Sequence, residues 1–334
     1  MLGNRPIIEQ IRRQATAGLL SHAYLITGEK GMGKKTLARQ ICLETFCRNR
    51  KNGAPCGECP DCKKVLSGNH PDVITVTHEK PQTLAVDEVR DQVCDTVGIR
   101  PYFGGRKIYI IPDAEKMNPQ GQNALLKTLE EPPEYVTILL LAEDERAMLD
   151  TVKSRCVKMK LQTVEDEEIR QFLLQGGPAG RSGRDGAESI DAVDAQIAVG
   201  FARGNPGRAL EMALDDGFRS TYRAAVGLCR NAKTMTAAEI SKTAQTFKNT
   251  QDALLMLELL GNWFRDLLCF RMTKRTEDLY FRGELSAIRS QSAGIRPETA
   301  ENFILEAEEA AARLRANVNR EQTLTLLFLK MRDL

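Results

Sequence analysis

A glycine-rich loop followed by two lysines is the first feature of this sequence that could do chemistry. Residues 28–36 read GEKGMGKKT and lie between a short apolar run, predicted to be a strand, and a segment predicted to be a helix. A phosphate-binding P-loop requires that context, and the alternative is a glycine turn beside a surface lysine. In a P-loop, Gly28, Gly31 and Gly33 would let backbone N–H groups close around phosphate oxygens, and Lys34 would reach the terminal phosphates. We therefore interpret the segment as a candidate nucleotide site.

Two residues that should bind magnesium at such a site are altered. The pattern asks for Ser or Thr directly after the lysine, but this chain has Lys35 there, and Thr36 is turned about 100° further round the helix. The second ligand should be an Asp that ends the strand predicted at 107–111. Pro112 stands there instead, and a shift of one residue to Asp113 would turn a strand side chain to the opposite face. We expect little or no ATP hydrolysis, and the sequence leaves open whether ATP or ADP binds.

Four closely spaced cysteines form the most specific motif of the chain. They are Cys47, Cys56, Cys59 and Cys62, in the pattern C-x8-C-x2-C-x2-C. Four thiolates on adjacent turns can close a tetrahedral zinc site, and because no coordination position stays open, the metal would be structural. An iron–sulfur cluster also uses four cysteines, and a redox Cys-x-x-Cys pair is a third alternative. Two overlapping pairs with a distant fourth cysteine favour zinc.

Composition limits the class of protein without selecting a partner. The chain has 334 residues, a formal net charge of +2 and 42% hydrophobic residues, which suits two or three soluble globular domains. No apolar run approaches the roughly 20 residues of a membrane helix, and the N-terminus lacks the apolar block of a secretory signal. We expect a cytoplasmic protein whose thiols stay reduced, which favours a metal over disulfides.

Strands and helices are predicted to alternate along the first part of the chain, which indicates a parallel sheet covered by helices. The predicted strands are 23–26, 73–76, 107–111 and 136–142. The predicted helices are 7–19, one from Lys34, 85–97 and one opened by Asn118-Pro119 and ended by Pro132-Pro133. Between the second helix and Pro71 we expect a cysteine-rich loop.

Beyond about Leu161 the pattern becomes helical. A helix is predicted at 165–174, followed by a flexible glycine-rich loop at 175–186 and a turn at 204–207. We therefore divide the chain into an α/β P-loop domain at 1–162 with the cysteine module inserted at 47–62, a small helical domain at 163–210 and a C-terminal helical domain at 211–334.

Three further stretches complete a resemblance to a known family. His22-Ala23-Tyr24-Leu25 leads into the P-loop, residues 123–133 read NALLKTLEEPP, and Ser154-Arg155-Cys156 follows. Together with the P-loop and the inserted cysteine module, these motifs resemble the bacterial clamp-loader branch of the AAA+ family over residues 1–210. The resemblance implies that the three predicted domains are an AAA+ domain, a helical lid and an oligomerisation collar.

The resemblance also implies roles and partners. In that family the arginine of the Ser-Arg-Cys motif, here Arg155, is a finger that acts in trans on a neighbour's ATP, although pairing with a local carboxylate is the alternative. Arg208 stands where the family has a second phosphate sensor, or is a plain surface arginine. The family's gamma/tau and delta subunits would be partners in a hetero-oligomeric ring of the DNA polymerase III holoenzyme, which loads the sliding clamp onto primed DNA.

The residues and the resemblance together leave three candidate functions. Lys35 and Pro112, with Glu143 where the gamma/tau ATPase carries a phosphate-sensing Thr, favour a clamp-loader subunit with little or no ATPase activity of its own. A working ATPase motor of gamma/tau type is the alternative. A standalone zinc-dependent nucleic-acid binder is a third hypothesis, which the modest net charge disfavours.

Overall fold

The computed structural model describes residues 1–78, 82–103, 105–177 and 190–334, and these form two compact units. The first unit contains Met1–Glu165 and Asn205–Gly207; the second contains Asp166–Gly204 and Arg208–Leu334. Within the described residues, no helix combines the length and the apolar character that crossing a membrane requires. Most of the glycine-rich loop predicted at 175–186 lies outside the described residues. The three-domain division, with boundaries at 162 and 210, stays a prediction.

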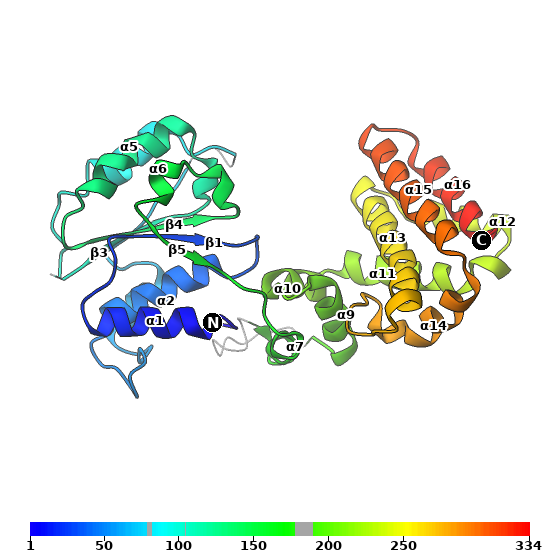
Figure 1. Cartoon of the computed structure of the whole chain (residues 1–334), viewed down its shortest axis with the longest axis horizontal. Helices are drawn as coiled ribbons and strands as arrows, with labels where there is room; N and C mark the ends of the chain where they lie inside the picture. Colours follow the sequence, from blue (N-terminus) through cyan, green and yellow to red (C-terminus); the bar gives the residue numbers. More distant parts are fainter. Residues whose placement is uncertain (79–81, 104, 178–189) are drawn as a thin grey trace. The chain divides into compact units, whose positions relative to one another are not determined.

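The first unit is built on a parallel five-stranded sheet in the order β2-β3-β4-β1-β5 (Figure 1). Its strands are β1 (Ala23–Thr27), β2 (Val73–Thr75), β3 (Lys107–Ile111), β4 (Val136–Ala142) and β5 (Val157–Lys160). Every residue of β1 and β4 is buried, as expected for near-continuous apolar strands in the middle of a parallel sheet.

The fifth strand was not predicted from the sequence. β5 reads VKMK, a short alternation of apolar and basic residues, and it pairs with β1 from Tyr24↔Val157 to Thr27↔Lys160. Lys158 and Lys160 are exposed while Met159 is buried. An edge strand buries one face only, so four residues carry too little apolar signal to be distinguished from a loop.

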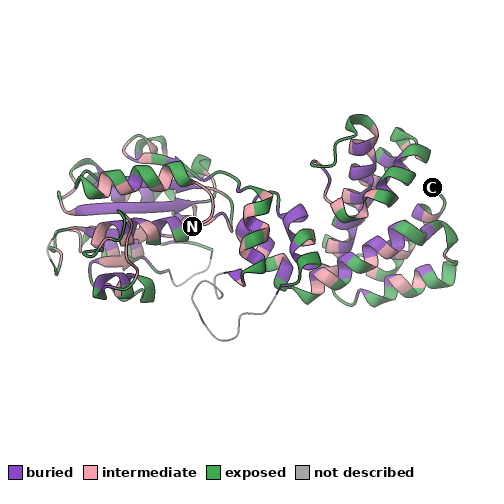
Figure 2. Ribbon diagram, turned by 90° about the horizontal axis from the view of Figure 1, so that it is seen from below, coloured by how far each residue is buried: buried purple, intermediate pink, exposed green. Residues whose placement is uncertain are grey.

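Helices cover both faces of this sheet (Figure 1). On one face, α1 (Arg5–Thr16) and α2 (Lys34–Phe46) pack against the strands through Ile11, Leu37 and Ile41. On the other, α5 (Pro119–Glu130) and α6 (Asp150–Lys153) do so through Leu125, Leu129 and Val152. Figure 2 shows the sheet buried between helices whose outer sides are exposed. The predicted parallel α/β layering is confirmed.

Two predicted segments differ locally from the structure. The cysteine-rich segment contains the helix α3 (Pro60–Ser67), with Cys59 as its N-cap and Pro60 in its first turn. A proline at the first helical position is a start signal that the loop prediction overlooked. The helix predicted at 85–97 is a short α4 (Val86–Val89) followed by a π-helical turn at Arg90–Cys94.

The second unit is helical throughout its described residues, as predicted. Its helices are α7 (Asp166–Leu174), α9 (Ala192–Ala202), α10 (Pro206–Leu214, of which Arg208 onward belongs to this unit), α11 (Asp216–Asn231), α12 (Ala237–Thr246), α13 (Thr250–Thr273), α14 (Leu285–Gly294), α15 (Pro297–Arg315) and α16 (Arg320–Arg332). Trp263 lies at the centre of the core, 1% exposed, and its indole N–H donates to Gln291 Oε1 at 2.9 Å. The apolar residues of α13 therefore form part of a core.

Candidate nucleotide site and cysteine cluster

The glycine-rich loop joins the end of β1 to the start of α2, in the strand–loop–helix arrangement that a P-loop requires. Gly31 and Gly33 have φ values of 91° and 97°, in the left-handed region where a side chain would be strained. Gly33 is also the N-cap of α2. The glycine pattern of the sequence therefore corresponds to a backbone conformation that needs it.

Lys34 is bound by the loop itself. Its ammonium group donates to the carbonyl oxygens of Gly28 at 2.5 Å and Glu29 at 3.1 Å. Burial lowers the pKa of Lys34, and the negative charges of Glu143, Glu115 and Asp113 oppose that shift. The ammonium group that would contact the terminal phosphates is thus hydrogen-bonded to carbonyl groups of its own loop. It also experiences the negative charge of three carboxylates.

A turn distant in the sequence closes against the same loop. The backbone N–H of Gly207 donates to Gly31 O at 3.0 Å, and Asn205 Nδ2 donates to Lys30 O at 2.8 Å. A Cβ atom on Gly207 would lie 2.5 Å from Gly31 Cα, so only glycine permits this approach. The sequence predicted a turn at 204–207 but gave no sign that it contacts the P-loop.

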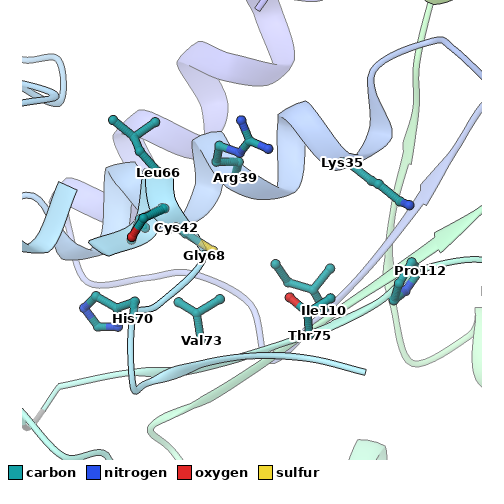
Figure 3. A pocket seen from close by; sticks show the side chains of 12 residues that line it. Lys35, Arg39, Cys42, Leu66, Gly68, His70, Val73, Thr75, Ile110 and Pro112 are labelled. Carbon is teal, nitrogen blue, oxygen red and sulfur yellow. The ribbon is translucent and has the colours of Figure 1, made fainter. Parts of the chain in front are cut away.

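Lys35 extends from the start of α2 toward Pro112 at the end of β3 (Figure 3). Both residues line a cavity of about 320 Å³ between α2 and β2, where Arg39 also lies. Within the described ranges, neither Lys35 nor Arg39 has an ion-pair partner. Thr36 is exposed on the helix surface. An unpaired ammonium group therefore lies beside the position where a P-loop would hold magnesium.

The candidate magnesium ligand Asp113 lies in a turn and not in a strand. β3 ends at Ile111, and Asp113 has φ 51° and ψ 44°, so the strand alternation expected from the sequence does not extend to it. Its Oδ2 atom lies 3.3 Å from Lys116 Nζ and 3.8 Å from His78 Nε2. The ammonium group of Lys116 competes with any metal for the Asp113 carboxylate.

The four cysteines of the motif come together. Cys47 follows α2, Cys56 lies in the loop, Cys59 caps α3 and Cys62 lies within it, and their Sγ atoms are all within 4.8 Å of one another. The pattern of thiols predicted from the spacing is thus confirmed as a cluster that could hold a metal ion. The pair Cys47 Sγ and Cys56 Sγ is 3.7 Å apart.

Backbone N–H groups point at the sulfur atoms of this cluster. Cys56 N donates to Cys47 Sγ at 3.2 Å, Cys59 N to Cys56 Sγ at 3.3 Å and Cys62 N to Cys59 Sγ at 3.4 Å. Burial alone would raise the pKa of Cys59, but hydrogen bonds from the backbone of Cys62 and Arg48 lower it to about 6. Thiolates are the form of cysteine that binds metal, so these backbone donors favour coordination by Cys59, whereas burial raises the pKa of Cys62.

A buried glutamate joins the cysteine segment to the helices beneath it. Glu44 of α2 is fully buried, and its carboxylate accepts from Arg12 of α1 at 3.2 Å, Arg50 of the cysteine segment at 3.1 Å and Gln40 at 3.0 Å. Three donors satisfy a charge that would be costly alone. Sequence reasoning missed Glu44, because a single glutamate in a helix carries no signal of its partners.

Arg155 lies between α6 and β5, half-buried. Its Nη2 atom is 2.6 Å from Glu130 Oε1, and its Nη1 atom donates to Thr151 O at 2.8 Å. Local pairing with a carboxylate, which the sequence left open, is therefore present. Arg208 lies in the second unit, where its Nη2 atom is 3.5 Å from Glu258 Oε1.

Arg155 and the P-loop of its own chain lie at opposite ends of the parallel strands. Arg155 precedes β5, whose first residue pairs with Tyr24, while the P-loop begins after Thr27 at the other end of β1. The three-residue rise between those ends spans about 10 Å. The structure thus forms a loop at residues 28–36 and, separately, a cluster of the four cysteines. Arg155 lies at the opposite end of the strands from the loop.

Comparison with known proteins gives two kinds of relative. A family model described as "DNA polymerase III, delta subunit" matches residues 3–165. The tau/gamma subunit of Haemophilus influenzae is 35% identical over 52% of this chain, and the match covers 25% of that protein. The delta' subunit of Pseudomonas aeruginosa is 39% identical over 41% of this chain and 42% of its own length.

A delta' relative extends along nearly the whole chain. The delta' subunit of Bacillus subtilis is 26% identical over 94% of this chain and 92% of its own length. The chain belongs to the DNA polymerase III clamp-loader family, as a delta' subunit. The resemblance drawn from the P-loop, residues 123–133 and the Ser-Arg-Cys motif is confirmed, and the tau/gamma relatives match only part of the chain.

Proposed function

We propose that this delta' chain is a subunit of the clamp loader that retains the architecture of an ATP site without hydrolysing ATP, and that it donates Arg155 to a neighbouring ATPase subunit. Its partners would be the gamma/tau and delta subunits in a hetero-oligomeric ring. Through that ring it would help to load the sliding clamp onto primed DNA in replication.

The altered magnesium position is the observation that carries this proposal. Magnesium requires oxygen ligands in near-octahedral geometry, whereas Lys35 places an unpaired ammonium group there and Asp113 is engaged by Lys116. An ammonium group repels the metal yet can still neutralise phosphate charge. The expected result is weak or absent hydrolysis, with nucleotide binding a separate question.

The position of Arg155 supports action on a neighbour. Arg155 and the P-loop of the same chain lie at opposite ends of the parallel strands, so its guanidinium cannot serve its own site without a rearrangement of the sheet. With 34% of its side chain exposed, it remains accessible to another subunit. An arginine placed at a transferred phosphoryl group is worth on the order of 10³–10⁵ in kcat.

A zinc ion held by Cys47, Cys56, Cys59 and Cys62 would complete the first unit. Four sulfur ligands leave no position for substrate, so the ion would stabilise the fold and do no catalysis. The contacts of Glu44 with Arg12 and Arg50 would transmit that stability from the cysteine segment to α1 and α2.

Reconstitution with gamma/tau, delta and the clamp tests the proposal. The isolated chain should show no magnesium-dependent ATP turnover above background, while the complex turns over ATP and loads the clamp. Arg155→Ala should leave assembly intact and lower turnover of the complex by roughly 10³-fold or more, because the transition-state charge loses its counter-ion. Robust turnover by the isolated chain would instead support a gamma/tau-type motor, and normal turnover with Arg155→Ala would exclude the finger.

A further inference from the structure

The guanidinium of Arg155 is held from two sides by its own chain. On one side, Nη1 donates to Thr151 O at 2.8 Å and to Ser154 Oγ at 3.3 Å, both in the turn that precedes it. On the other, Nη2 contacts Oε1 of Glu130, the last residue of α5, at 2.6 Å. Among the described residues, no acceptor takes the Nε–H group or the second hydrogen of Nη2, so both remain for an outside ligand.

The two elements that supply these partners are fixed to each other. Gln122 of α5 is 2% exposed; its Nε2 donates to Ala147 O at 3.0 Å, and its Oε1 accepts from Leu149 N at 2.8 Å. Leu149 is the N-cap of α6, which carries Thr151. The carboxylate of Glu130 and the carbonyl of Thr151 therefore sit on one buried support and define a fixed orientation for the guanidinium.

From this geometry we infer that Glu130 is a positioning residue for the arginine finger, an inference that rests on the proposed role of Arg155. A free arginine side chain has considerable rotamer freedom, and a group that must meet a transition state loses less entropy when it is already oriented. Glu130 would not contact the phosphate itself; it would orient the guanidinium group of Arg155, which does. Because the pair is about one-third to one-half exposed, it contributes little to the stability of the fold.

The chain supplies a matched control beside this residue. Glu131 follows Glu130 directly, is exposed, and has no ion pair within the part of the chain that the structure describes. The two positions share side-chain type and neighbourhood. Only Glu130 reaches the guanidinium, so a difference between the two variants reports the contact with Arg155.

The test measures kcat and KM for ATP in the reconstituted clamp loader with clamp and primed DNA. Glu130→Ala should lower kcat roughly tenfold, the order of loss expected when a supporting partner is removed. The KM for ATP should stay unchanged, because a finger acts in the transition state. Glu130→Gln should recover most of kcat, since its amide oxygen still accepts from Nη2, and Glu131→Ala should match the unaltered chain.

The Arg155→Ala background separates this inference from the finger itself. If Glu130 acts through Arg155, Glu130→Ala should cause no further loss once Arg155 is gone. A large loss in Arg155→Ala with normal or raised kcat in Glu130→Ala would keep the finger and overturn the positioning role. A further loss of kcat in the double variant would show that Glu130 acts on the stability of the fold and not through Arg155. Normal turnover in Arg155→Ala would overturn both proposals.

Discussion

Single side chains decide what each site of this chain can bind. Lys35 stands where the P-loop pattern asks for a hydroxyl ligand of magnesium, in a loop whose glycines Gly31 and Gly33 have the left-handed conformation that the pattern requires. In the cysteine cluster the reverse holds: four sulfur atoms and the N–H groups aimed at them favour a bound cation. From these side chains we predict that the chain binds zinc at the cysteine cluster and does not bind magnesium at the P-loop for ATP hydrolysis.

Cys59 is the residue at which the metal assignment can be tested. Cys59→Ser should abolish zinc binding, because a hydroxyl is a poor zinc ligand, whereas serine is a good N-cap and can still accept from Cys62 N at the start of α3. Metal analysis of the purified protein gives the measurement. Cys269→Ser, which changes a half-buried thiol outside the cluster, should retain the zinc. Iron in place of zinc, or zinc retained by Cys59→Ser, would contradict the assignment.

At the scale of elements, loops from distant parts of the chain complete the first unit. The 205–207 turn satisfies two carbonyl groups of the P-loop, and Glu44 connects α1, α2 and the cysteine segment. The conformation of the P-loop thus depends on a turn about 175 residues away in sequence.

Gly207→Ala tests the contact between that turn and the P-loop. A methyl group would meet Gly31 Cα at 2.5 Å, and because backbone cannot move aside as a side chain can, we expect a loss of about 1–3 kcal/mol in the free energy of unfolding. Denaturant unfolding provides the measurement. The control is Gly227→Ala in α11, where a methyl group has open space and should be neutral or stabilising by up to about 1 kcal/mol. Equal effects of the two substitutions would show that the contact is unimportant.

At the scale of the whole molecule, the chain consists of two units with separate cores. The cysteine cluster lies entirely in the first unit, and the core around Trp263 lies in the second. The match to the delta' subunit of Bacillus subtilis covers 94% of this chain and therefore extends over most of both units. The two cores should therefore respond differently to loss of the metal.

Removal of zinc should separate the unfolding of the two units. A strong chelator should lower the melting temperature of one calorimetric transition, because metal-binding free energy stabilises only the unit that binds it, and should leave the other unchanged. The Cys59→Ser protein provides the control, since its transitions should not shift further with chelator. A parallel shift of both transitions would show that the units unfold as one.

The sequence by itself determined the features that depend on local order. The P-loop at 28–36, the cysteine spacing and the strands 107–111 and 136–142 follow from glycine placement, side-chain type and apolar periodicity over a few residues, and the structure has them. The family resemblance also came from such short motifs. These signals can be read from the sequence alone, because neighbouring residues set the backbone conformation that they report.

Only the tertiary structure decided how those motifs are used. It placed Asp113 in a left-handed turn beside Lys116, brought Gly207 onto the P-loop, and set Glu130 against Arg155. It also showed that Arg155 and the P-loop of its own chain lie at opposite ends of the parallel strands β5 and β1. Such contacts join residues that are not related by any periodic pattern in the sequence. They form only when the sheet and the helices have packed, so the sequence alone does not predict them.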